Sequence, residues 1–235
     1  MDYQELLELV QKRRSVRRFR PDPVSYEDVE RIVEVARWAP SGANSQPWEM
    51  VVVRQPELKD GVVDILREHS DYTRKVELTR EEEMRHAGVS RPWSRPGYAD
   101  APVFIFICGD PRTEEAYPLS ARLNHGDEIL ASSQASALLY MHLAATSLGL
   151  GSQWVSATSD RFAQRLIKQL LDIPQEMEIY DMMALGYPAR EPGPRLVREG
   201  RELIHRERYD RARFRSEEEV RGFILQLRRE RTGRP

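Results

Sequence analysis

The run "KRRSVRRFR" at residues 12–20 carries six basic residues and no acidic one. Arg13, Arg14 and Arg17 would present planar cations with several donors, which suit phosphate, and Ser15 adds a hydroxyl that could bond a phosphate or sugar oxygen. A run of this kind also occurs as solvated surface or as a contact to nucleic acid. Its place in the fold must decide among these uses.

A second candidate site is the long polar turn in "WAPSGANSQPWEMVVV", residues 38–53, where a predicted helix gives way to an apolar strand. Two or three turn residues would be enough to join these elements, so the surplus of small residues needs another purpose. Small side chains let backbone N–H groups approach a flat ligand. Polar side chains are also at hand in Ser41, Asn44, Ser45 and Gln46. An ordinary long loop is the alternative.

The sequence offers no evident set of catalytic side chains. The histidines are scattered along the chain, at His69, His86, His125, His142 and His205. None of them falls into a Ser-His-Asp or Cys-His arrangement or into a metal-ligand spacing, so we predict no catalytic side chain and no metal ion. Chemistry carried by a bound cofactor fits this pattern, because the protein then supplies binding, orientation and electrostatics.

The elements that must position these residues follow from hydrophobic periodicity. The predicted helices are 2–14, 25–39, 56–68, 127–148, 160–171 and 216–230. The predicted strands lie within 49–54, 101–110, 149–157 and 177–189. Ser25 and Ser216 are the expected helix caps, and Glu219 completes a capping box with Ser216.

Residues 69–100 lack a clean period, and an irregular stretch of that length inside a compact protein is usually a lid, a binding loop or disorder. We predict a lid. The arginine- and glutamate-rich tail, 195–235, is predicted to form an arm whose last helix needs a surface to cover. With 235 residues, 40% of them hydrophobic, the chain is long enough for a sizeable core. The expected organisation is a single α+β domain over 1–235.

Cysteine content and hydropathy bear on the compartment. Cys108 is the one cysteine, and it lies in the apolar run "VFIFIC", so no disulfide within the chain is possible and a reducing compartment is favoured. No stretch approaches the roughly 18 consecutive apolar residues of a membrane span. The N-terminus carries acids where a secretory signal would carry bases. We therefore predict a cytoplasmic protein with no membrane partner.

Taken together, "RRSVRRF", "APSGANSQPWEMVVV", "GLGSQW" and "ALGYPA" occur in an order and at a spacing that resemble the nitroreductase family of flavin enzymes. The resemblance covers most of residues 10–205. It implies a three-layer fold, with a central mostly antiparallel sheet flanked by helices, in an obligate homodimer. It also implies FMN as the bound cofactor and NAD(P)H as a transient reductant.

The resemblance also assigns roles to residues. Arg13, Arg14, Ser15 and Arg17 would hold the FMN phosphate and ribityl chain. Ser156 and Ala157 would run under the isoalloxazine ring. Four loop residues would cross the dimer interface to the partner's flavin: Pro40, Ser41, Gly42 and Asn44. Arg198 and then Arg195 are the choices for a second phosphate contact. Ser133 matches a flavin-contact position, although a helix-packing serine explains it equally.

The implied reaction is a ping-pong transfer of reducing equivalents from NAD(P)H, through FMN, to a nitroaromatic, a quinone or a related conjugated acceptor. Tyr72, Trp93 and Tyr98 of the predicted lid could stack on an aromatic substrate, although they could equally anchor the lid. Some members of the superfamily remove halogen from halotyrosines. Others convert their flavin to the lower ligand of cobalamin, which nothing in this sequence requires.

Two hypotheses of other classes stay open beside the oxidoreductase. One is a flavin-binding carrier or sensor without efficient turnover, which would hold FMN and oxidise NAD(P)H negligibly. The other is a nucleic-acid-binding protein that uses its two arginine-rich ends and would bind with a steep salt dependence. The net charge of −2 and the many glutamates of the tail argue against nucleic acid.

Overall fold

The structure is a computed structural model, and it describes residues 2–85, 94–193 and 195–232. The chain divides into two compact units. The first unit comprises residues 1–69 and 94–192, and the second comprises residues 70–93 and 193–235. Trp93 of the predicted lid lies outside the described residues.

A four-stranded antiparallel sheet forms the centre of the first unit, in the order β1-β2-β4-β3. The strands are β1 (Trp48–Val53), β2 (Val103–Gly109), β3 (Gly151–Val155) and β4 (Glu178–Gly186). Every residue of β2 is buried, as its unbroken apolar sequence predicts for a central strand. The short strand β3 lies at one edge of the sheet.

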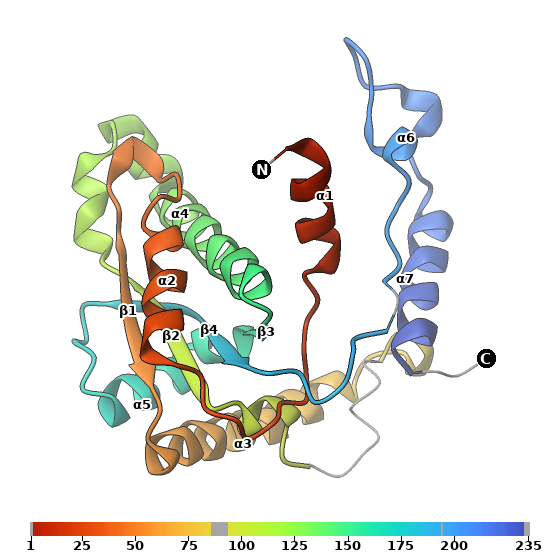
Figure 1. Cartoon of the computed structure of the whole chain (residues 1–235). Helices are drawn as coiled ribbons and strands as arrows, with labels where there is room; N and C mark the ends of the chain where they lie inside the picture. The colour runs from red at the N-terminus through yellow and green to blue at the C-terminus, as the bar shows by residue number, and fades with distance from the viewer. Residues whose placement is uncertain (1, 86–93, 194, 233–235) are drawn as a thin grey trace. The chain divides into compact units, whose positions relative to one another are not determined.

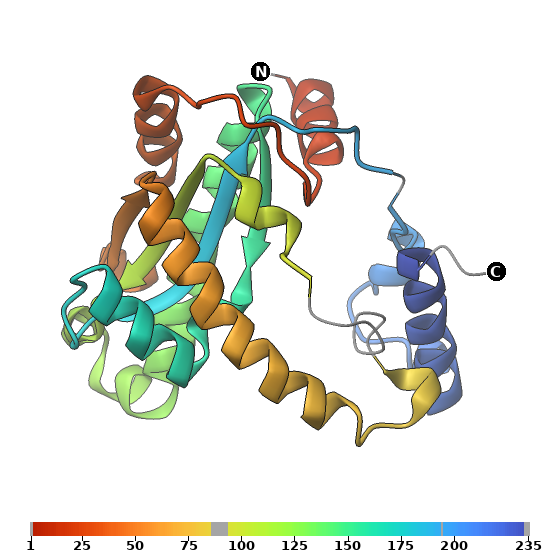
Figure 2. The same ribbon diagram turned by 90° about the horizontal axis from the view of Figure 1, so that it is seen from below.

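Helices cover both faces of this sheet (Figures 1 and 2). They are α2 (Tyr26–Ala36) and α4 (Leu119–Ser147) on one face, and α3 (Pro56–Glu77) and α5 (Arg161–Leu170) on the other. Successive residues of β2 point to opposite faces, so Ile105 packs in the core beside α2 and α4 and Phe106 in the core beside α3 and α5. The predicted three-layer α+β fold is confirmed.

Two helices differ in length from the sequence prediction. The helix predicted over 56–68 continues to Glu77 in the structure. The prediction ended too early because the apolar stripe ends at Leu66 and the charged turns that follow carry no hydrophobic period. The predicted helix 127–148 begins earlier, at Leu119, and is interrupted at His125, whose φ of −158° is not helical. Leu138, Met141 and the other core-facing residues of this helix are buried, as expected for a central helix.

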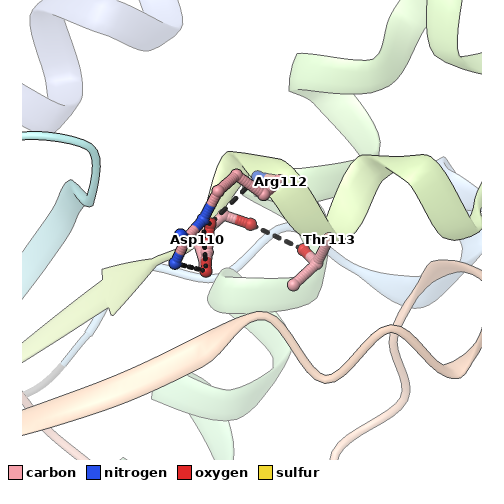
Figure 3. Close-up of polar contacts among 3 residues, drawn as sticks. All are labelled: Asp110, Arg112 and Thr113. Atoms are coloured by element: carbon pink, nitrogen blue, oxygen red, sulfur yellow. Dashed lines mark hydrogen bonds and ion pairs between the residues drawn. The ribbon is translucent and has the colours of Figure 1, made fainter.

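The end of β2 is fixed by a local polar turn. Asp110 caps the following 3₁₀ helix by accepting a hydrogen bond from the backbone N–H of Arg112 at 3.0 Å, and Thr113 Oγ1 donates to the Asp110 carbonyl at 2.6 Å (Figure 3). The Arg112 guanidinium lies 2.6 Å from the Asp110 carboxylate and lowers the pKa of that carboxyl. Such a turn stops the strand without leaving its last groups unsatisfied.

The remaining helices are short or lie near the chain ends. They are α1 (Tyr3–Lys12), α6 (Gly200–Leu203) and α7 (Glu217–Thr232), with 3₁₀ turns at Gly42–Asn44, Glu82–Met84, Gly97–Asp100, Pro111–Ala116, Ser156–Ser159 and Arg211–Arg213. The predicted capping box of α7 is confirmed, since Ser216 Oγ accepts from the Glu219 N–H and the Glu219 carboxylate accepts from the Ser216 N–H. None of the helices in the described ranges has both the length and the apolar character needed to cross a membrane.

In the second unit, the predicted lid and the predicted arm pack together. Arg221 of α7 forms ion pairs with Glu81, at 2.6 Å, and with Glu83. In the arm, His205 and Tyr209 stack with their ring centroids 4.1 Å apart. The segments 70–93 and 193–235 therefore form one compact body although they are far apart in the sequence.

Candidate functional site

The basic run predicted to bind phosphate lies beside β3, the edge strand of the sheet. Ser15 forms a parallel β-bridge with Ser152 of the edge strand β3, and the Val16 N–H donates to the Ser152 carbonyl at 2.9 Å. Val16 is buried and anchors the run to the core beside α3 and α5. The sheet thus fixes the backbone that carries the predicted phosphate ligands.

The other end of the same run is fixed by the chain that follows β4. The Arg20 N–H donates to the Tyr187 carbonyl at 2.9 Å, and the Ala189 N–H donates to the Arg18 carbonyl at 3.0 Å. Phe19 is buried between these contacts. Backbone hydrogen bonds therefore hold the run at both ends, and the exposed arginine side chains remain able to change conformation.

Two arginines of the run, Arg14 and Arg17, are available to an anion. Arg13 and Arg14 are half-buried and Arg17 is exposed. Within the ranges that the structure describes, no carboxylate lies within 4.0 Å of the Arg14 or Arg17 guanidinium. Arginines grouped on a fixed backbone suit a phosphate, because each guanidinium can donate two parallel hydrogen bonds.

The segment predicted to lie under the flavin ring continues directly from β3. The strand ends at Val155, and Ser156 and Ala157 open the 3₁₀ turn that follows. The buried Thr158 closes this turn by donating to the Val155 carbonyl at 3.1 Å. One strand thus carries the backbone contact to Ser15 near its start and leads into Ser156 and Ala157 at its end.

A row of linked, buried polar side chains lies between β3 and its neighbours α4 and β4. His142 Nδ1 lies 2.7 Å from Ser152 Oγ, and the His142 ring stacks on Trp154 at 5.6 Å with an interplanar angle of 15°. The Trp154 indole N–H donates to the carboxylate of Asp181. His142, Ser152 and Asp181 are all buried. These linked side chains are not recognisable as functional in the sequence, where the one visible signal is an acidic residue inside the apolar strand "MEIYDMMALG".

Burial gives His142 a measurable effect on stability. Burial lowers the pKa of His142 from 6.5 to about 4, with a smaller contribution from the charge of Arg13. The unfolded chain therefore takes up a proton near pH 6.5 that the folded chain accepts only near pH 4. We expect the free energy of unfolding to be constant above about pH 6.5 and to fall by about 3 kcal/mol between pH 6.5 and 4 on this account.

Urea unfolding at a series of pH values checks this prediction. His142→Gln should remove most of the slope between pH 6.5 and 4, since glutamine does not titrate. His125→Gln, at an exposed histidine, is the matched control and should keep the slope. An equal slope in wild type and His142→Gln would contradict the prediction.

The polar loop after α2 is built on α4. The Gly42 N–H donates to Ser133 Oγ at 3.1 Å, and the Ser133 hydroxyl donates to the Ile129 carbonyl at 2.7 Å. A Cβ on Gly42 would lie 2.2 Å from Ile129 Cγ2, so glycine is needed here for space. Ser133 therefore supports the loop, whatever further contact it makes.

The same loop holds an unusual backbone conformation. Ala43, Asn44 and Gln46 have φ values of 49°, 54° and 45°, a region that residues with a Cβ rarely adopt. Ser41 Oγ accepts from the Gln46 N–H at 3.0 Å and braces the turn, while Pro40 and Asn44 are exposed. Strained backbone of this kind is concentrated at binding and active sites.

The remaining predicted site residues lie elsewhere. Arg195 is exposed and Arg198 Nε pairs with the Glu202 carboxylate at 3.3 Å; both arginines belong to the second unit. Tyr72 is also in the second unit and 67% exposed. Tyr98 belongs to the first unit, packs edge-on against Phe104 at 6.3 Å, and has its pKa raised to about 12 by burial.

Comparison with known proteins places this geometry in a family. The model of the nitroreductase family matches residues 10–187. A 5,6-dimethylbenzimidazole synthase of Rhodospirillum rubrum is 32% identical over 195 residues, which cover 82% of this chain and 86% of that protein. A protein of Archaeoglobus fulgidus provisionally named as an NADH dehydrogenase/NAD(P)H nitroreductase is 28% identical over 188 residues, 80% of this chain and 88% of its own length.

A solved structure agrees with the sequence matches. The crystal structure of an iodotyrosine deiodinase bound to FMN and 3-iodo-L-tyrosine superposes with a TM-score of 0.67 at 25% identity. The match covers 87% of this chain and 100% of the deiodinase chain. The sheet order, the basic run on the edge strand and the match over residues 10–187 lead to the same conclusion: the chain belongs to the nitroreductase family.

Proposed function

We propose that this protein is an FMN-dependent oxidoreductase that passes reducing equivalents from NAD(P)H to a small conjugated acceptor, such as a nitroaromatic or a quinone, by a ping-pong mechanism. The observation that carries the proposal is that one strand connects two predicted contact regions. The basic run holds β3 through Ser15 and Val16, and β3 leads directly into Ser156 and Ala157. Two similar proteins support the proposal: one is named as an NAD(P)H nitroreductase, and the structure of the other contains FMN.

The described residues fit FMN chemically. Arg13, Arg14 and Arg17 offer guanidinium groups to the phosphate, and Ser15 offers a hydroxyl. The small residues Ser156 and Ala157 leave their backbone open to a flat ring. Arg198, with Arg195 as the alternative, is proposed as a further phosphate contact.

When bound, FMN supplies the hydride and electron transfer, and the protein supplies binding and electrostatics. The basic run would orient the cofactor by holding its phosphate next to β3. The backbone of Ser156–Ala157 would determine which face of the ring is left open to substrate. The roles of residues 69–100 as a lid and of Tyr72, Trp93 and Tyr98 in acceptor binding remain predictions.

We further propose a homodimer in which four loop residues contact the flavin of the partner subunit, namely Pro40, Ser41, Gly42 and Asn44. Exposed apolar side chains support a second copy as partner. Tyr3 and Val10 on α1 are 77% and 44% exposed, α1 buries no residue, and Trp38, next to the loop, is 74% exposed. The cytoplasmic location proposed for the dimer rests on the single cysteine, which the structure places in the core with 1% exposure.

Steady-state kinetics test the proposed reaction. Initial rates with NADH or NADPH against a quinone or nitroaromatic acceptor should give parallel double-reciprocal lines, because the nicotinamide leaves before the acceptor binds. Intersecting lines would contradict the ping-pong order. Bound FMN with negligible oxidation of NAD(P)H by any acceptor would favour the carrier or sensor instead.

Two specialised flavin reactions are the alternatives, because relatives bear their names. Release of iodide from 3-iodo-L-tyrosine by the reduced protein would indicate a reductive dehalogenase. Formation of 5,6-dimethylbenzimidazole by the flavin-loaded protein would indicate a 5,6-dimethylbenzimidazole synthase. Either activity, found together with slow turnover of quinones and nitroaromatics, would replace the proposed acceptor class.

A further inference from the structure

Asp181 is a buried carboxylate that the proposed function leaves without a role. It is 6% exposed and lines a cavity of about 870 Å³ in the first unit, bounded by α4, α5 and the start of β4. Its Oδ2 accepts from the Trp154 indole, while Oδ1 has no hydrogen-bond partner among the described residues. A buried carboxylate with an unsatisfied oxygen is costly, so a structural role alone explains it poorly.

No cation neutralises this carboxylate directly. Within the described ranges, no Lys, Arg or His nitrogen lies within 4.0 Å of it. Lys168, the most buried base of the cavity wall, donates instead to the Gln175 carbonyl at 3.1 Å. The charged or titratable groups that face the same cavity are Asp127 of α4, Arg161, Arg165 and Lys168 of α5, and Glu178 and Tyr180 of β4. His142 stacks on the face of the Trp154 ring, and Asp181 accepts from the N–H at its edge.

Asp181 is also close to the segment proposed to lie under the flavin ring. Burial raises the pKa of Asp181, and the hydrogen bond from the Trp154 indole lowers it in part. In the antiparallel register of β3 and β4, Val155 pairs with Met182, so Ser156 directly follows the last pair on one side and Asp181 lies next to it on the other. Because the site is partly withdrawn from water, the charge of the carboxylate acts with less screening than it would at the surface.

We propose that Asp181 lowers the reduction potential of an FMN bound at Ser156 and Ala157. When the carboxylate is ionised, its charge disfavours the negative charge that reduction adds to the flavin. This inference rests on the proposed function. A fixed charge near the ring is one of the means by which a protein adjusts the electronics of a flavin. The ionised carboxylate makes the bound flavin harder to reduce, and protonation of the carboxylate removes that effect.

The midpoint potential of the bound FMN, measured by anaerobic equilibration with a reference dye, tests the inference. Asp181→Asn keeps the shape of the side chain and an acceptor for the Trp154 N–H but removes the charge. At alkaline pH we expect reduction of the variant to be favoured about tenfold, a shift of about 30 mV for a two-electron couple. Towards acid pH the potentials of the two proteins should converge, since wild-type Asp181 is then protonated.

Glu178→Gln is the matched control, because it removes one carboxylate from the same cavity at an exposed position. It should leave the potential nearly unchanged. Trp154→Phe is a second test if Asp181→Asn does not fold. Loss of the indole donor should raise the pKa of Asp181 and move the pH dependence of the potential upward.

The outcomes separate this inference from the proposed function. A chain that takes up no FMN would overturn both. Bound FMN with the same potential in wild type and Asp181→Asn at every pH would overturn this inference alone. An equal shift in Glu178→Gln and Asp181→Asn would also overturn it, because the effect would then be one of net charge.

Discussion

Arg13→Ala is expected to weaken FMN binding by about 10- to 100-fold. A hydrogen bond to a charged group contributes about 1.5–3 kcal/mol, and removal of the guanidinium takes away one such contact to the proposed phosphate. Arg13 is half-buried on a run whose backbone is held by β3. Fluorescence titration of the apoprotein with FMN measures the dissociation constant.

Arg18→Ala is the matched control for Arg13→Ala. Arg18 belongs to the same basic run and is exposed, and it has no assigned contact to the cofactor. The two variants lose the same charge, so a general electrostatic effect would weaken binding equally in both. Equal losses would remove Arg13 from the proposed phosphate site, and a loss confined to Arg13→Ala would support it.

Gly97→Ala should be the most damaging small substitution in the first unit. A Cβ at residue 97 would lie 1.7 Å from the Arg17 carbonyl oxygen and 2.9 Å from its carbon, both of which are backbone atoms that cannot rotate away. The turn Gly97–Asp100 or the basic run must therefore shift. We expect a loss of about 3 kcal/mol in the free energy of unfolding, at the upper end for overpacking, together with weaker FMN binding.

Urea unfolding and FMN titration of the same sample check this prediction. Gly222→Ala is the control, since a Cβ at residue 222 would meet no atom within 4 Å. That helical position should tolerate alanine or gain slightly in stability. Gly97→Ala with wild-type stability and wild-type affinity would show that the contact to Arg17 does not constrain the site.

The fold was predictable where local patterns are strong. The run "VFIFICG" is apolar throughout and forms the central strand β2, and Ser25 and Ser216 cap the helices as expected. The end of α3 was not predictable, because the turns before Glu77 are charged and lack a hydrophobic period. Local patterns therefore located the elements better than their ends.

The candidate site was predictable as separate motifs, while its supporting contacts were not. His142, Ser152 and Asp181 each look ordinary in the sequence, and their link through Trp154 exists only after α4, β3 and β4 have packed. The polar loop shows the same limit. Its positive φ angles fall on Ala43 and other residues with a Cβ, whereas Gly42 is required by the approach of Ile129.

The visible absorption spectrum of the purified protein, with FMN added and then NADH or NADPH under anaerobic conditions, tests the central claim most directly. The proposed function predicts a bound-flavin spectrum that bleaches when a nicotinamide is added and returns when an acceptor is supplied. Absence of bound flavin at saturating FMN would contradict the proposed cofactor site. Bound flavin that neither nicotinamide reduces would contradict NAD(P)H as the reductant.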